Sequence, residues 1–149
     1  MLMTLSISDI LRKKLESVED TTSIQEVAKK MKDRDVSSLV VVDTNGKPVG
    51  IVTERDIITK VCTNDVPTST VISKEIMSTP LITIKGSSST STAAEMMIKN
   101  DVRHLLVIDS NDKPIGIITP LDLTRNQAHT ADEDREAIET VLDRYMEWL

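Results

Sequence analysis

The chain has 149 residues, 39% of them apolar, and a formal net charge of −6. A chain of this length can bury about two-thirds of its unfolded surface, which predicts a globular protein. The negative charge and the lack of a long Lys/Arg cluster argue against nucleic-acid binding, because that binding depends on basic residues that neutralise phosphates.

The sequence also lacks the patterns of exported or membrane proteins. No run approaches the roughly 20 apolar residues that a bilayer span needs, and Met1–Asp9 has no basic start followed by a long apolar run. Cys62 is the only cysteine, so it cannot form a disulfide within the chain. We therefore expect a cytoplasmic protein with no membrane partner.

The N-terminal half opens with short elements. Alternation over Leu2–Ile7 indicates a short strand or an arm that packs on the rest, and Leu15–Val18 indicates a short strand. Ser23 and Glu26 have the spacing of a capping box. They precede a helix whose apolar residues recur at helical spacing.

A hairpin follows this helix. The apolar run Leu39–Val42 predicts a strand covered on both faces. Asp43–Lys47 forms a turn that contains an Asn-Gly pair, and Val49–Val52 is the returning strand. Thr53 then caps a helix that ends near Val61.

The same order of elements recurs 66 residues later. Val36–Asp56 matches Val102–Asp122 without a gap, and Leu81–Ile84 matches the first short strand. In the second copy Pro120 follows Thr119, and proline is well tolerated at the first helical position, so Thr119 is again the N-cap. The expected boundaries are a first repeat over 7–61, a linker over 62–74 and a second repeat over 75–126.

The remaining segment, 130–149, predicts an amphipathic helix. Thr130 and Glu133 have capping-box spacing, and Ile138, Leu142, Tyr145 and Leu149 recur at helical spacing. The helix either covers its own repeat or forms a dimer contact, since Tyr145 and Trp148 lie here and aromatic residues are enriched in interfaces.

Each repeat carries the motif Gly-apolar-apolar-Thr-x-x-Asp where a strand meets a helix. Glycine allows another group to approach the backbone closely, free amides at a helix start favour a phosphate, and a carboxylate accepts hydrogen bonds from both hydroxyls of a ribose. The competing interpretation is structural, because Thr-x-x-Asp is nearly a capping box by itself. The two copies, each preceded by a glycine and a hairpin, favour a ligand site.

These features resemble the cystathionine-β-synthase (CBS) domain, and the pair resembles the tandem known as a Bateman module. The similarity covers about 7–125, and its most specific pieces are Gly50–Asp56, Val102–Asp109 and Pro114–Thr119. It implies an α+β fold of two β-α-β-β-α repeats, packed by pseudo-twofold symmetry and followed here by a C-terminal helix. It also implies clefts between the repeats that bind AMP, ADP, ATP or S-adenosylmethionine, and a homodimer.

The resemblance assigns roles to individual residues. Asp56 and Asp122 bind the ribose diol, Thr53 and Thr119 contact ribose or phosphate, and Ser37 and Arg103 occupy the position that often meets phosphate. Adenine is expected near Leu15–Val18 and Leu81–Ile84. Arg55 either reaches a phosphate or is a solvated helix residue.

No catalytic constellation or metal-ligand spacing is visible in the sequence. We therefore expect a stand-alone regulatory module, not an enzyme, that requires no cofactor and no metal and that signals to an unknown protein target. One alternative is a scaffold or oligomerisation protein with no ligand, in which the threonines only cap helices. A weaker alternative is a small enzyme acting on nucleotides.

Overall fold

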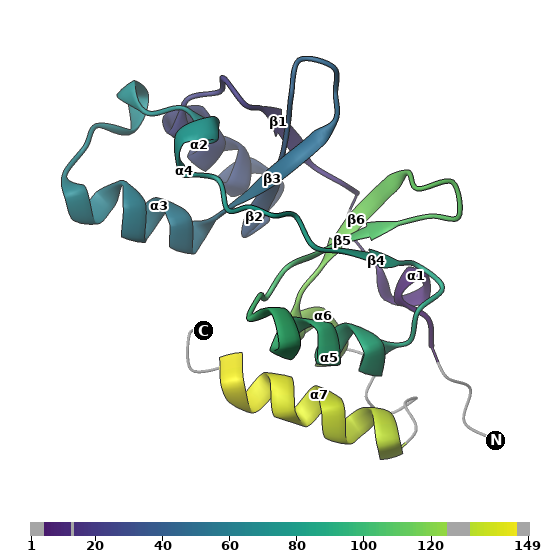
Figure 1. Ribbon diagram of the computed structural model, residues 1–149. Helices are drawn as coiled ribbons and strands as arrows, with labels where there is room; N and C mark the ends of the chain where they lie inside the picture. The colour runs from purple at the N-terminus through teal and green to yellow at the C-terminus, as the bar shows by residue number, and fades with distance from the viewer. Residues whose placement is uncertain (1–4, 13, 125–131, 146–149) are drawn as a thin grey trace. The chain divides into compact units, whose positions relative to one another are not determined.

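The computed structural model describes residues 5–12, 14–124 and 132–145 of the chain, with the side chains of 132–134 left aside. These residues belong to two compact units. Glu16–Leu81 forms one, here named the first-repeat unit, and Met1–Leu15 with Ile82–Leu149 forms the other, the second-repeat unit. Figure 1 shows the elements of each unit, and each unit is described by itself.

The first-repeat unit contains a three-stranded sheet with helices around it. Strand β1 runs parallel to β2, and β2 runs antiparallel to β3. The elements are, in chain order, β1 (Ser17–Glu19), α2 (Ile24–Arg34), β2 (Ser38–Val42), β3 (Pro48–Thr53), α3 (Glu54–Lys60), the short 3-10 helices η1 (Cys62–Asn64) and η2 (Thr68–Thr70), and α4 (Ser73–Ile76).

The second-repeat unit repeats this plan among its described residues. Its sheet has the order β4-β5-β6, again with one parallel and one antiparallel pairing. The elements are α1 (Ile7–Ile10), β4 (Thr83–Lys85), α5 (Thr90–Asn100), β5 (Leu105–Ile108), β6 (Pro114–Ile118), α6 (Pro120–Thr124) and α7 (Asp132–Tyr145). The predicted α+β class, with two matching repeats and a C-terminal helix, is confirmed.

The central strands are buried on both faces, as their apolar runs predict. In β2, Leu39 and Val41 belong to the core of their own unit, while Val40 between them points to the opposite face, and all three are fully buried. Strand β5 has the same character, with Leu105, Leu106 and Val107 at most 2% exposed. Such strands read as continuous apolar runs because neither face meets water.

Aspartates organise both hairpin turns. The Asp43 carboxylate accepts hydrogen bonds from the backbone N–H groups of Asn45 and Lys47, both at 2.9 Å. Asp109 does the same for Asn111 and Lys113 in the second copy. The last turn position has positive φ in both loops, 78° at Gly46 and 62° at Asp112. Glycine and, less readily, aspartate are the residues that tolerate this conformation.

The structure confirms the cap predicted at Ser23 and changes the expectation for the N-terminal strand. Ser23 is the N-cap of α2, and its hydroxyl accepts from the Glu26 N–H at 3.2 Å, as expected. The Glu26 carboxylate lies 3.4 Å from Lys29. Ile7 begins the short helix α1, so the expected strand over Leu2–Ile7 does not include it, and residues 1–4 lie outside the described part.

Helices α1 and α4 are the short helices that open the first and the second repeat. Each of them packs in the unit that contains the other repeat. Helix α1 belongs by sequence to the first repeat, yet Ile7 and Ile10 are buried in the core of the second-repeat unit. Helix α4 belongs by sequence to the second repeat, yet Ile76 is buried in the core of the first-repeat unit. Figure 1 shows α1 in purple beside the green strands of the second-repeat unit. The repeats therefore exchange their first segments.

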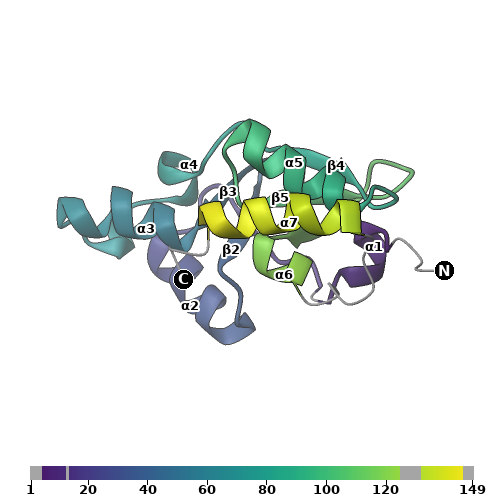
Figure 2. The same cartoon turned by 90° about the horizontal axis from the view of Figure 1, so that it is seen from below.

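Helix α7 packs along α5 within the second-repeat unit, as Figures 1 and 2 both show. Ile138, Val141 and Tyr145 enter the core of this unit. The Tyr145 hydroxyl donates to the Met97 carbonyl at 3.2 Å and lies 3.1 Å from the Asp101 carboxylate. The described part of α7 thus covers its own repeat. The predicted cap at Thr130 and the apolar positions Trp148 and Leu149 lie outside the described residues.

Candidate functional site

The first candidate corner lies where β3 meets α3. Thr53 is the N-cap of α3, and its hydroxyl accepts from the Asp56 N–H at 3.1 Å. The Asp56 Oδ2 in turn accepts from the Thr53 N–H at 3.0 Å and from its hydroxyl at 3.1 Å. This is the reciprocal capping box that the spacing predicted, so the structural role of the pair is present in the fold.

The second corner, between β6 and α6, has the same construction. Asp122 Oδ2 accepts from the Thr119 N–H at 2.9 Å and from the Thr119 hydroxyl at 3.0 Å. The return bond, from the Asp122 N–H to the Thr119 hydroxyl, is longer, at 3.4 Å. Pro120 begins α6 directly after Thr119, as predicted. The repeated sequence therefore builds the same Thr–Asp pair twice.

The two aspartates differ in their surroundings. Asp56 is 6% exposed, and its Oδ1 accepts from the Ser78 hydroxyl at 2.9 Å and lies 3.0 Å from the Lys60 ammonium. Asp122 is partly exposed. The sequence analysis missed Lys60 and Ser78. Lys60 had a local signal, since a lysine four residues after an aspartate on a helix indicates an ion pair, but Ser78 is distant in sequence and had none.

The expectation of free amides at these helix starts needs correction. The Glu54 N–H donates to the Ser37 carbonyl at 3.0 Å, and the Asp56 N–H donates to Thr53. In the second corner the first helical residue is Pro120, which has no N–H. Helices α3 and α6 are also short, with 7 and 5 residues. Side chains, rather than helix-end amides, therefore define what these corners offer to a ligand.

The close approach at the motif glycines comes from the protein itself. A Cβ on Gly50 would lie 2.7 Å from the Met77 sulfur and 3.0 Å from the Ser78 carbonyl oxygen. A Cβ on Gly116 would lie 3.1 Å from a methyl group of Leu11. Met77 and Leu11 each follow a short exchanged helix. These glycines therefore make room for the exchanged segments.

The predicted phosphate-contacting residues lie at the same sheet ends as the corners. Ser38 pairs with Thr53, so Ser37 is beside the start of α3, where it is exposed. Leu105 pairs antiparallel with Ile118, so the residues just before Leu105, including Arg103, lie at the end of the sheet where β6 meets α6. Arg103 is partly buried. Each unit thus brings its predicted residues to one edge, although their contact with a ligand stays a prediction.

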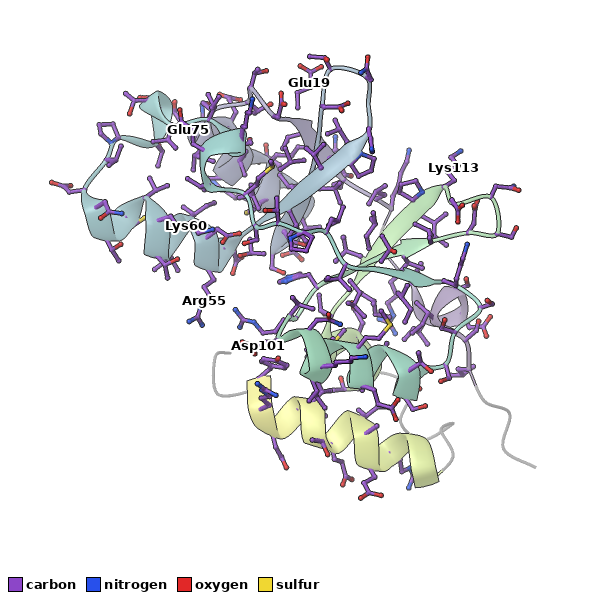
Figure 3. The ribbon with its side chains drawn as sticks, in the orientation of Figure 1. Glu19, Arg55, Lys60, Glu75, Asp101 and Lys113 are labelled. Carbon is purple, nitrogen blue, oxygen red and sulfur yellow. The ribbon has the colours of Figure 1, made fainter. Side chains whose placement is uncertain are left out.

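Arg55 projects from the first turn of α3. Its side chain is exposed and points away from the helix, as Figure 3 shows. Lys60 is labelled on the last turn of the same helix. The structure thus keeps Arg55 and Lys60 at different ends of α3, and Lys60 pairs with Asp56.

The charge of Arg103 acts on the end of α7. Burial raises the pKa of the Tyr145 hydroxyl, and its hydrogen bond to Asp101 and the negative charge there raise it further, while the charges of Arg144 and Arg103 oppose this shift. Arg144 also pairs with Asp101 at 3.2 Å. Arg103, just before β5, therefore lies close enough to the end of α7 for its charge to act on Tyr145.

The stretches expected near adenine are partly committed to the cores. Val18 is 8% exposed and Ile84 is 4% exposed, and each belongs to the core of its own unit. Glu16 pairs with Lys30 and Arg34 of α2. The side chains of Val18 and Ile84 are thus part of the cores, and the expected adenine contact of these stretches remains a prediction.

Metal-ligating side chains and long apolar helices are the remaining features to consider in the part of the chain that the structure describes. No three His, Cys, Asp or Glu side chains among them gather as a metal site would require. None of the described helices is both long enough and apolar enough to cross a bilayer.

Comparisons with known proteins find relatives of similar length and longer ones. An uncharacterized protein of Methanopyrus kandleri is 32% identical over 120 residues, which cover 80% of this chain and 61% of that protein. An uncharacterized conserved protein of Pyrococcus horikoshii has a solved structure that is 33% identical, with a TM-score of 0.75 over 88% of this chain and all of that one.

A further similar structure is a complex with a nucleotide. It is the CBS domain protein PAE2072 from Pyrobaculum aerophilum complexed with AMP, which is 26% identical with a TM-score of 0.75 and covers 83% of this chain and 94% of that one. The model of the CBS domain matches residues 7–62 and again residues 72–129. The chain therefore belongs to the CBS domain family and carries the domain twice.

Proposed function

We propose that the protein is a regulatory module that binds an adenosine derivative and passes the binding event to a protein target. The observation that carries the proposal is the Thr119–Asp122 corner, in which a partly exposed carboxylate lies at the same sheet end as Arg103. Support comes from the family and from the AMP complex of the Pyrobaculum aerophilum relative. The proposal includes a homodimer in the cytoplasm and no catalytic activity.

The corner supplies groups that match a nucleotide. A carboxylate only accepts hydrogen bonds, so Asp122 suits the two hydroxyls of a ribose. Thr119 has a hydroxyl that both donates and accepts, and it is assigned to ribose or phosphate. Arg103 supplies a fixed cation with a planar set of donors, which suits a phosphate group.

The cation also bears on the choice of ligand. AMP, ADP and ATP carry phosphate, whereas S-adenosylmethionine carries a sulfonium cation near its ribose. Arg103 attracts the first and repels the second, so we propose that phosphorylated ligands bind more tightly. The ligand regulates only if it binds one conformation of the protein better than another, because a ligand with equal affinity for both shifts nothing.

Calorimetric titration of the whole chain with AMP, ADP, ATP, adenosine and S-adenosylmethionine tests the proposal. We expect AMP to bind, Asp122→Ala to abolish binding, and Arg103→Gln to reduce AMP affinity about 10-fold or more, because hydrogen bonds to charged groups are worth about 1.5–3 kcal/mol. Adenosine affinity should change little in Arg103→Gln.

The matched control is Lys99→Gln, which removes one positive charge from an exposed position on α5. It should leave AMP affinity unchanged. If none of the five compounds binds, the result would favour the alternative of a scaffold without a ligand. AMP binding that survives Asp122→Ala unchanged would refute the assigned corner. Steady ATP turnover that one carboxylate substitution abolishes would instead support an enzyme.

A further inference from the structure

The last turn of α7 is attached to the C-terminal end of α5 by Tyr145. The Tyr145 side chain belongs to the core of the second-repeat unit. Its hydroxyl donates to the Met97 carbonyl at 3.2 Å, in a buried hydrogen bond, and lies 3.1 Å from a carboxylate oxygen of Asp101. Figure 3 labels Asp101 at this end of α5, beside the last turn of α7. We name Tyr145 with Met97 and Asp101 the α7 anchor.

The same Met97 carbonyl also fixes the turn that leaves α5. It accepts from the Val102 N–H at 3.0 Å, while the Asp101 N–H donates to the Ile98 carbonyl at 3.3 Å. Asp101 has the left-handed conformation, with a φ of 51°. These bonds end α5 as a Schellman motif does, and the motif sets the direction of the residues that follow. The Tyr145 hydroxyl therefore bonds to the carbonyl that closes this turn.

The residues that leave this turn carry the cation of the second corner. Arg103 lies in residues 101–104, the connection between α5 and β5. Leu105, which follows the connection, pairs with Ile118 at the sheet end where β6 meets α6. Arg103 is close enough to the end of α7 for its charge to lower the pKa of Tyr145. The connection thus starts at the α7 anchor and leads into the sheet end of the second corner.

The first repeat has the same turn without the tyrosine. The Val36 N–H donates to the Met31 carbonyl at 3.0 Å, and Asp35 has a φ of 52°, so the geometry matches that at the end of α5. The chain has one tyrosine, Tyr145, and α7 follows the second stretch that matches the CBS domain, 72–129. The anchor is therefore an addition to the repeat, and it occurs at the copy that has an arginine in the position predicted to contact phosphate.

Two kinds of contact hold this end of α7, and they differ in strength. Arg144 pairs with Asp101 at 3.2 Å, but the two side chains are 47% and 76% exposed, so the pair contributes little to stability. The Tyr145 hydroxyl bonds to Met97 in a buried position. Leaving a buried acceptor with fewer donors costs more than losing an exposed ion pair. Tyr145 is thus the residue through which the docking of α7 acts on residues 101–104.

We propose that α7 senses the phosphate of a ligand in the second corner: the α7 anchor and the phosphate both hold residues 101–104, so α7 docking and phosphate binding stabilise each other. This inference rests on the proposed function, because it assigns the regulation of that same site. A segment that one contact has ordered loses less conformational entropy when a second contact forms, which gives positive coupling. The coupling is reciprocal, so a ligand whose binding α7 strengthens must also strengthen the docking of α7. Tyr145 is then a positioning residue for Arg103.

The first experiment separates the phosphate from the rest of the ligand. Calorimetric titration of the whole chain compares AMP with adenosine in the wild type, Tyr145→Phe and Thr140→Val. Tyr145→Phe keeps the ring and removes the hydroxyl, so AMP affinity should fall about 5-fold or more, as for a typical coupling between sites, while adenosine affinity should change little. Thr140→Val is the matched control, because the Thr140 hydroxyl donates to the Glu136 carbonyl within α7 itself, at 2.9 Å. Both of its affinities should equal those of the wild type.

Two results of this titration would overturn the inference. One is an AMP affinity that Tyr145→Phe leaves unchanged, which would show that the anchor does not act on the site. The other is an equal loss of affinity for AMP and adenosine in Tyr145→Phe, which would show a general loss of structure instead of an effect on the phosphate contact.

The second experiment observes the coupling at Tyr145, through the absorbance of its phenolate form. The positive charge of Arg103 lowers the pKa of Tyr145, and a bound phosphate offsets that charge. Saturating AMP should therefore raise the pKa of Tyr145, and adenosine should not. In Arg103→Gln the pKa of Tyr145 should already be higher without ligand, and AMP should not move it. A pKa of Tyr145 that is the same with and without AMP in the wild type would overturn the inference.

The third experiment needs no ligand and separates this inference from the proposed function. Amide hydrogen exchange at Val102 should be faster in Tyr145→Phe than in the wild type, because the turn that holds this N–H loses support, and Thr140→Val should leave it unchanged. Equal exchange rates in the wild type and Tyr145→Phe would overturn the role of the α7 anchor. If the wild type binds neither AMP nor adenosine, the proposed function fails, and the exchange rates still decide whether α7 supports residues 101–104.

Discussion

Replacing Gly50 by alanine should destabilise the protein, whereas the same change at Gly116 should cost little. A Cβ on Gly50 would lie 2.7 Å from the Met77 sulfur, which belongs to a flexible side chain. It would also lie 3.0 Å from the carbonyl oxygen of Ser78, which is a backbone atom. That carbonyl is fixed by its hydrogen bond from Ile51. At Gly116 the nearest atoms, at 3.1 and 3.3 Å, are methyl groups of the Leu11 side chain, which can move by a few tenths of an ångström.

The magnitude follows from two opposing effects. Overpacking lowers the free energy of unfolding by about 1–3 kcal/mol. Replacing glycine by alanine also reduces the entropy of the unfolded chain, which raises the free energy of unfolding by about 0.4–1 kcal/mol. We therefore expect Gly50→Ala to lower the free energy of unfolding by about 1–2 kcal/mol. For Gly116→Ala the two effects nearly cancel, and the change should stay within about 0.5 kcal/mol.

Urea unfolding of both variants, followed by circular dichroism, is the assay. A shift in midpoint without a change in slope reports a change in stability alone. In a thermal scan the Gly50→Ala change corresponds to a fall in Tm of about 2–4 °C per kcal/mol. Adding Met77→Ala should relieve only part of the cost, because the Ser78 carbonyl remains. Equal stability of Gly50→Ala and Gly116→Ala would refute the reasoning.

Two further predictions concern titrating groups. Burial and the Asp101 hydrogen bond raise the pKa of Tyr145 above its ordinary 10.0, so its contribution to stability is complete below pH 10 and is lost as the pH rises through the folded-state pKa. Tyr145 is the only tyrosine, so its phenolate absorbance can be followed directly. A pKa at or below 10 in the folded protein would contradict the predicted upward shift. The N–H groups of Lys113 and Asn111 lower the pKa of Asp109 below 3.8, so its contribution is complete above that pH and is lost as the pH falls through the folded-state pKa. Carboxyl NMR titration should find Asp109 ionising below 3.8, and a value at or above 3.8 would show that the two bonds do not persist in solution.

The sequence by itself determined the order of the main strands and helices and the local caps, but not the short helices α1 and α4. The 66-residue repeat predicted two equal sets of strands and helices, and the Thr53–Asp56 and Thr119–Asp122 spacings predicted capping boxes that the structure contains. These features depend on residues within a few positions of one another. Hydrophobic periodicity, turn residues and capping pairs express their energy locally, so they can be read without knowledge of the fold.

Only the tertiary structure decided which segments meet. The short helices α1 and α4 pack in the unit of the opposite repeat, and this exchange brings Leu11 to Gly116 and Met77 to Gly50. It also brings the Ser78 hydroxyl to Asp56, where it donates a hydrogen bond of 2.9 Å to the carboxylate of the motif. No local pattern encodes such pairings, because their free energy comes from burying apolar side chains and satisfying polar groups between segments that are distant in the chain.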